Sequence, residues 1–209
     1  FLCEEQITPA MFADCAALHF CSVDLVDWPV KAAHRRAIGL AQEAGALISF
    51  DPNVRLPLWE RPEDCQAAIR AFLPFADLVK LSDDEVEFVT GCKEEREAAR
   101  RLFAGGCRML LVTRGADGAA IYTRGAYAET ETIPVPVTDT TGAGDSFIGS
   151  FLYQLTRDGV TAEQLDRLSE ERLASYLQFS ARYASLTVQR KGAVMATLEE
   201  LRRAYPDKE

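Results

Sequence analysis

The chain has 209 residues, of which 48% are hydrophobic, and its net charge at neutral pH is -9. This composition supports one sizeable apolar core and excludes a disordered protein. The negative charge argues against nucleic acid and against an anionic membrane surface as partners, because both repel a field of that sign, and we therefore expect a protein that acts on a small molecule.

Predicted strands and helices alternate along most of the chain. Residues 1–16 show neither a helix start nor an initiating Met, and we expect further residues before Phe1. From there, short apolar runs typical of buried strands alternate with segments of helical periodicity. Strands are predicted at 17–21, 47–50, 78–81, 109–113, 119–122 and 130–137. Helices are predicted at 30–44, 63–75, 94–104, 145–157, 161–188 with a break, and 197–204.

Strands that are separated by helices of this length pair in parallel, which predicts a doubly wound α/β sheet and a single domain over residues 1–209. In such sheets, ligands bind outside the carboxyl ends of the strands. Polar clusters follow the predicted strands at 51–55, 82–85, 113–118 and 139–145. We expect these four clusters to converge on one cleft.

Residues 139–145, DTTGAGD, form a glycine turn that opens an amphipathic helix. Gly142 and Gly144 have no Cβ, so a phosphate can approach the unpaired N–H groups at the positive end of the helix dipole. Asp145, in the first turn, is placed to accept a proton. An anion site beside a carboxylate base suits phosphoryl transfer to a hydroxyl. The alternative is that the glycines only shape a turn and Asp145 only stabilises the helix start.

Several other site classes are excluded by the sequence. It contains no GxxxxGK[ST], and Phe147 stands where a GxGxxG pattern has its third glycine, so neither a P-loop nor a dinucleotide fingerprint is present. The six cysteines lack metal spacing, which indicates reduced thiols. His19 and His34 are predicted as a core and a surface residue rather than as catalysts. No membrane span or secretory leader is recognisable, so we expect a cytoplasmic location.

The motif DTTGAGDSFIGSFL resembles the signature of the ribokinase-type carbohydrate kinases, and SFDPNVRLPLW and KLSDDEVEFVTG are most similar to the fructokinase branch. TRGADG at 113–118 and RKGA at 190–193 follow in the same order. The resemblance implies a ribokinase-like, Rossmann-like three-layer fold without most of the lid and the N-terminal, sugar-binding part. It implies an ATP-dependent kinase that transfers the γ-phosphoryl group to a sugar hydroxyl, with fructose as first candidate and fructose 6-phosphate as product.

The resemblance also implies roles for individual residues. Asp145 would be the base, and the N–H groups of Gly142, Ala143 and Gly144 would form the anion hole. Glu85 would hold Mg²⁺ through water, although Ser82 and Glu85 also match a helix capping box. The implied nucleotide-binding residues are Ser82, Thr113, Arg114, Gly115, Ala116, Gly118 and Gly144. A monovalent cation such as K⁺ would bind at Asp139, Thr141, Thr187, Arg190 and Gly192. Asn53 and Arg55 would contact substrate or phosphate.

The sequence departs from the family pattern at a few positions and leaves alternatives open. Ser82 stands where the family often has Asn, Ala181 replaces an Asn or His near the adenine, and Ala196 replaces a Ser. Residues 113–118 also suit a plain hairpin turn. Alternative substrates are 2-keto-3-deoxygluconate, ribose and nucleosides. The alternative of another class is a truncated, catalytically silent protein that binds nucleotide or a partner. The resemblance also implies a homodimer for the full-length form.

Overall fold

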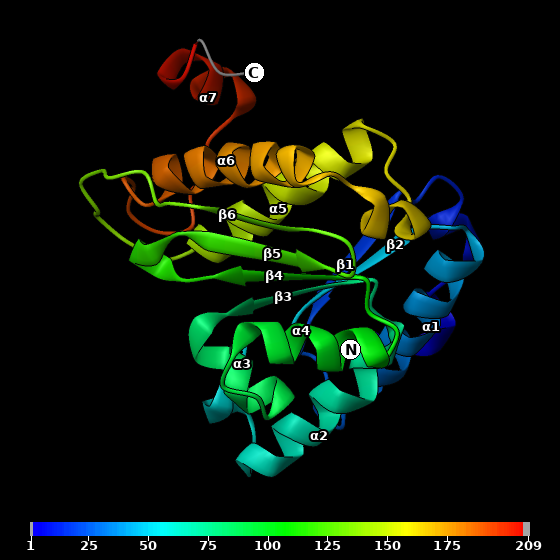
Figure 1. The fold of residues 1–209 in the computed structure, drawn as a ribbon. Coiled ribbons are helices and arrows are strands. Elements are labelled where there is room, and N and C mark those ends of the chain that lie inside the picture. Colours follow the sequence, from blue (N-terminus) through cyan, green and yellow to red (C-terminus); the bar gives the residue numbers. More distant parts are fainter. Residues whose placement is uncertain (1, 207–209) are drawn as a thin grey trace.

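The structure, a computed structural model, describes residues 2–206. Its strands form one sheet in the order β1-β2-β3-β4-β5-β6 (Figure 1). β1 to β4 are parallel, and β5 and β6 extend the sheet antiparallel. The bounds are β1 (Ala17–Cys21), β2 (Leu47–Asp51), β3 (Leu78–Ser82), β4 (Met109–Thr113), β5 (Ala119–Thr123) and β6 (Tyr127–Thr130). The mostly parallel sheet confirms the predicted fold class.

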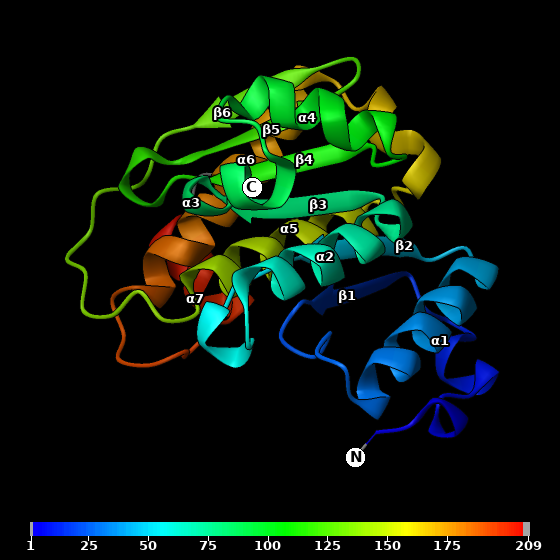
Figure 2. The same cartoon turned by 90° about the horizontal axis from the view of Figure 1, so that it is seen from below.

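Helices cover both faces of the sheet and make three layers (Figure 1). Four helices pack on one face: α1 (Pro29–Glu43), α2 (Pro62–Phe72), α3 (Asp83–Thr90) and α4 (Glu95–Ala104). The other face is covered by α5 (Ala143–Arg157) and α6 (Glu170–Thr187), and α7 (Leu198–Ala204) contacts α6. A 3-10 turn at Ala162–Arg167 precedes α6, which accounts for the predicted break in the helix at 161–188. Figure 2 shows β1 at one edge of the sheet, beside α1.

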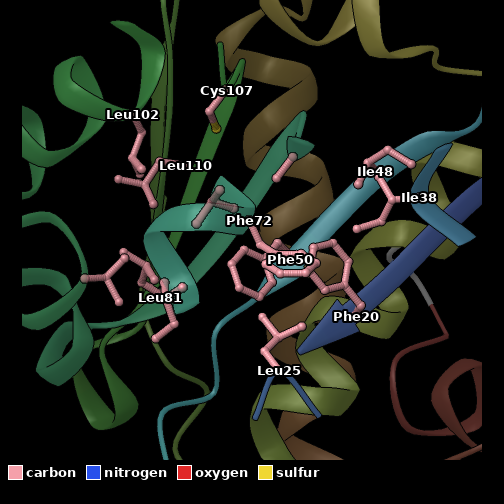
Figure 3. Packing of buried hydrophobic residues seen from close by; sticks show 14 of the residues in the cluster. Phe20, Leu25, Ile38, Ile48, Phe50, Phe72, Leu81, Leu102, Cys107 and Leu110 are labelled. Atoms are coloured by element: carbon pink, nitrogen blue, oxygen red, sulfur yellow. The ribbon is translucent and has the colours of Figure 1, made fainter. Parts of the chain in front are cut away.

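Two apolar cores follow from the alternation of side chains along the strands. Phe20 and Phe50 point toward α1–α4, where their rings stack with centroids 4.4 Å apart and Phe72 joins them (Figure 3). Leu47 and Leu78 point the other way, into the core beneath α5 and α6. Burial on both faces explains why β2, β3 and β4 read as continuous apolar runs in the sequence.

The prediction of a strand at 130–137 was wrong in its bounds. The tight turn at Arg124 and Gly125 brings Tyr122 opposite Tyr127 and Ala119 opposite Thr130, so β6 has no further partner in β5 beyond that point. Residues 131–137 form neither helix nor strand. Pro134 and Pro136 lack N–H groups and cannot donate to a sheet, which is consistent with this open conformation.

Local signals elsewhere match the structure. The Ser82 N–H donates to Glu85 Oε2 at 2.9 Å, as the predicted capping box requires, and α3 ends at Gly91 with a φ of 74°. All six cysteines lie within residues 2–206, and none of them forms a disulfide there. Within residues 2–206, no helix has the length and apolarity to cross a membrane.

Candidate active site

The glycine turn ends at the start of α5 and presents unpaired N–H groups. Gly142 has a φ of 80° and precedes the helix, and a Cβ there would lie 3.0 Å from Ala193 Cβ, so only glycine fits. Among the described residues, the N–H groups of Gly142, Gly144 and Asp145 donate no hydrogen bond. The Ala143 N–H, which was predicted to join them, donates to the Thr140 carbonyl at 3.1 Å. The turn therefore offers three N–H groups at the positive end of a helix, an arrangement that suits an anion.

Asp145 directly follows these N–H groups and is exposed in the first turn of α5. Its charge acts on the end of β1. Burial raises the pKa of the Cys21 thiol, and Asp145 adds to that shift. The His19 ring, although exposed at the edge of the sheet, is partly desolvated by its neighbours; this lowers its pKa, and Asp145 opposes the shift. Asp145 therefore lies close enough to β1 to influence both His19 and Cys21.

The loop after β2 is held by a buried ion pair. Asp51 Oδ2 lies 2.9 Å from Lys80 Nζ on β3, and Asp51 Oδ1 accepts the N–H of Asn53 at 3.0 Å. Burial raises the pKa of Asp51, and Lys80 opposes that shift. Asn53 has a φ of 46°, the one positive value for a non-glycine among the described residues. Such a conformation persists where the surrounding contacts maintain it, and it is frequent at functional sites.

Glu85 joins the same loop to α3. Its Oε1 accepts the Val54 N–H at 2.6 Å, in addition to the capping bond from Ser82 to Oε2. Each carboxylate oxygen keeps a second lone pair, which leaves room for a metal-bound water. Among residues 2–206, no three His, Cys, Asp or Glu side chains gather as a metal cage. A single carboxylate of this kind fits a hydrated Mg²⁺, because Mg²⁺ keeps several of its waters.

A cavity of about 550 Å³ opens beside the glycine turn. It brings together Gly144 with four of the predicted nucleotide-binding residues, Thr113, Gly115, Ala116 and Gly118. Its other walls are mainly apolar: Ile133, Pro134, Val135, Val137, Ala143, Phe147, Ala181, Ala184 and Val188. A largely apolar pocket with a few polar groups at one end is typical of a small-ligand site.

Two predicted nucleotide residues do not line this cavity. The Arg114 guanidinium makes two hydrogen bonds of 2.7 Å to Glu95 on α4, so its side chain serves the packing of that helix. Ser82 lies beside Thr113 in the sheet register and caps α3. The exposed Arg55 donates to the carbonyl of Val54, its own neighbour, at 3.0 Å.

Sequence reasoning missed some residues of this region. The cavity is lined by residues 132–135 and Val137, which the sequence pattern predicts as part of a strand. Lys80 was not singled out, although a lysine inside the apolar run LVKL was a signal for a buried charge. His19 was predicted to lie in the core; its Nδ1 lies 3.0 Å from Ser49 Oγ, yet the residue is exposed because β1 is an edge strand.

Comparison with known proteins identifies the family. A family model described as pfkB family carbohydrate kinase matches residues 5–200. The chain belongs to this family. Its glycine turn, its cavity and the loops after β2 and β3 all lie within the matched residues.

Relatives of this pfkB-family chain include named fructokinases. It is 38% identical over 193 residues to "probable fructokinase-2" of Arabidopsis thaliana. The aligned residues are 92% of this chain and 57% of the relative. The ATP-bound fructokinase structure from Xylella fastidiosa has a TM-score of 0.89 and 31% identity, covering 99% of this chain and 67% of that chain. A fructokinase double mutant from Vibrio cholerae O395, with fructose, ADP and potassium bound, has a TM-score of 0.84 and 29% identity, covering all of this chain and 64% of that chain. The chain therefore spans little more than half the length of the curated relative.

The two segments that were predicted to hold a monovalent cation lie together in this pfkB-family chain. Asp139 Oδ2 accepts the Gly192 N–H at 2.8 Å, and Asp139 Oδ1 accepts both the N–H and the hydroxyl of Thr141. These bonds lower the pKa of Asp139. The Thr187 carbonyl accepts the Arg190 N–H at 3.1 Å. The loop after α6 is thus bonded directly to the glycine turn.

Proposed function

We propose that the protein containing this chain is an ATP-dependent sugar kinase that transfers the γ-phosphoryl group of ATP to a sugar hydroxyl, with fructose as acceptor and fructose 6-phosphate as product. The observation that carries this proposal is the unpaired N–H groups of Gly142, Gly144 and Asp145 with the Asp145 carboxylate beside them. Family membership supports the reaction class. The relatives with bound ATP, and with bound fructose and ADP, support the choice of substrates.

In the proposed mechanism, the apolar cavity binds the nucleotide base and directs the phosphates toward Gly144. The Asp145 carboxylate accepts the proton of the sugar hydroxyl. The oxygen of that hydroxyl bonds to the γ-phosphorus, and the bond from the γ-phosphorus to the leaving ADP oxygen breaks. The Gly142 and Gly144 N–H groups stabilise the negative charge on the transferred group. Positioning and electrostatics supply most of the catalysis in such a reaction.

Glu85 is the residue we propose for contact with Mg²⁺, through water. Mg²⁺, when bound with ATP, supplies positive charge that offsets the charge of the phosphates. For a monovalent cation, the residues are Asp139, Thr141, Thr187, Arg190 and Gly192, acting chiefly through carbonyl oxygens. A relative with bound potassium supports this second site. We further propose a cytoplasmic enzyme whose full-length form is a homodimer.

The test is an assay of the whole protein for sugar-dependent ATP consumption, with fructose, ribose, 2-keto-3-deoxygluconate and a nucleoside as acceptors. Asp145→Asn should lower kcat by a factor on the order of 10²–10⁴ because the base is removed, with nucleotide affinity retained. Glu171→Gln is the matched control, since it removes an exposed carboxylate from the first turn of α6.

Each result separates one part of the proposal. Near wild-type turnover in Asp145→Asn would show that another group is the base. Fast turnover with ribose or a nucleoside, and slow turnover with fructose, would replace the acceptor but keep the reaction. Nucleotide binding without turnover on any acceptor would identify a silent binding protein.

A further inference from the structure

The buried charges of Asp51 and Lys80 lie under the glycine turn. Asp51 is 2% exposed and Lys80 is 6% exposed. The parallel register pairs Ser49 with Leu78 and Phe50 with Val79. Asp51 and Lys80 are the next residues of β2 and β3, so they occupy neighbouring positions on the two strands. Asp51 lies four residues after Leu47, and Lys80 lies two residues after Leu78. Side chains alternate along a strand, so both residues are on the face with these leucines, which α5 and α6 cover.

Lys80 contacts the glycine turn itself. A Cβ built on Gly144 would lie 3.2 Å from Lys80 Nζ and 3.9 Å from its Cε. The ammonium group therefore packs against the backbone of the residue whose N–H faces the proposed phosphoryl position. Its positive charge adds to the potential of that N–H group and of the helix terminus.

Asp51 links Lys80 to a second part of the site. One of its oxygens holds the Lys80 ammonium and the other accepts the Asn53 N–H. The next residue, Val54, donates its N–H to Glu85. A continuous series of contacts thus runs from the loop that meets Glu85, through Asp51 and Lys80, to Gly144.

The buried position of the Asp51–Lys80 pair is not explained by a contribution to the stability of the fold. A buried ion pair is desolvated at a cost that its own attraction often fails to offset, and apolar residues of similar size serve a core at least as well. The rest of this face offers such residues at Leu47, Leu78 and Met109. Among the described residues, the buried charges of this face are Asp51 and Lys80, near the start of α5.

We propose that the Asp51–Lys80 pair positions the glycine turn for phosphoryl transfer. Lys80 supports Gly144 and strengthens the anion hole, and Asp51 holds Lys80 in place. Both are positioning residues, since neither is placed on the substrate. This inference rests on the proposed kinase function and names what supports its anion hole.

The test measures two affinities of the whole protein, one for ADP and one for ADP with fluoroaluminate, which mimics the transferred phosphoryl group. Lys80→Met should weaken the fluoroaluminate complex by about tenfold or more and lower kcat similarly, while ADP affinity changes by less than about twofold. A merely structural role would alter both affinities together or neither. Lys93→Met, which removes an exposed lysine, is the control.

A double-mutant cycle covers the risk that Lys80→Met does not fold, because it leaves Asp51 buried without its partner. Asp51→Asn with Lys80→Met removes both charges and should show the same selective loss for fluoroaluminate as either single variant. Fully additive losses would overturn the coupling of the pair, and wild-type fluoroaluminate affinity in the double variant would overturn the proposal. If the wild type binds ADP with fluoroaluminate but consumes no ATP with any sugar, the proposed function fails while the role of the pair is still measured.

Discussion

The two faces of the central sheet differ in chemistry along the same strands. On the side of α1–α4, β2 and β3 present Ile48, Phe50, Val79 and Leu81, which are all buried and apolar. On the side of α5, the same strands begin with leucines and then present Ser49, Asp51 and Lys80 as they approach their carboxyl ends. The first face is built for stability over its whole length, whereas the second gives up apolar packing where α5 begins. The contrast indicates that the polar half of the second face serves the glycine turn.

The largest expected effect on the free energy of unfolding is at Phe50, and its neighbour Ser49, on the opposite face of the sheet, serves for comparison. Phe50→Ala should lower the free energy of unfolding by about 3–5 kcal/mol, because Phe50 is fully buried and stacks on Phe20. Ser49→Ala, which removes the contact with His19, should cost about 1 kcal/mol or less. Urea unfolding of the whole protein measures both. Equal costs would contradict the assignment of stability to the α1–α4 face.

A smaller effect is expected at the far end of the second face, where Asp158 follows α5. Asp158 accepts hydrogen bonds from Arg157, Arg172 and the Tyr176 hydroxyl. These partners, Arg157 first, lower the pKa of Asp158 to about 2. Because the folded-state pKa lies below the usual value near 3.9, the stabilisation is present above about pH 4 and disappears as the pH falls toward 2.

Asp158→Asn should therefore lower the free energy of unfolding by about 1–2 kcal/mol at pH 7, and the difference from wild type should shrink as the pH falls below about 4. Denaturant unfolding at a series of pH values measures this. Asp64→Asn, at the exposed pair with Arg61, should show no measurable change at any pH. A pH-independent loss at Asp158 would mean that its packing, rather than its charge, holds α5 to α6.

The smallest effect is expected on the helix that covers the second face. Gly149 lies inside α5, and a Cβ there would meet no atom within 4 Å. Gly149→Ala should raise the free energy of unfolding by about 0.5–1 kcal/mol, because alanine favours the helix. Gly118→Ala should instead destabilise, since its Cβ would lie 1.9 Å from the Thr130 carbonyl oxygen at a φ of 86°. Thermal melting distinguishes the two, and a loss of stability in Gly149→Ala would contradict the open space at that position.

Local patterns predicted much of the fold and the outline of the site. The strand at 17–21 and the strand at 109–113 have the predicted bounds. The glycine turn opens α5 as its spacing indicates, and the Ser82 and Glu85 capping box forms. These features depend on residues within a few positions of each other, so the sequence contains the whole signal. The strand predicted at 130–137 was misplaced because strand length depends on a partner from elsewhere in the chain.

By itself, the sequence determined the alternation of strands and helices, the glycine turn with Asp145, and the motifs that resemble carbohydrate kinases. Only the tertiary structure decided that Lys80 lies against Gly144, that Glu85 accepts the N–H of Val54 and that Asp139 bonds to Gly192. Each of these contacts joins segments from different strand-end loops or elements. Their geometry depends on how the sheet and its helices pack, and no short stretch of sequence contains that information.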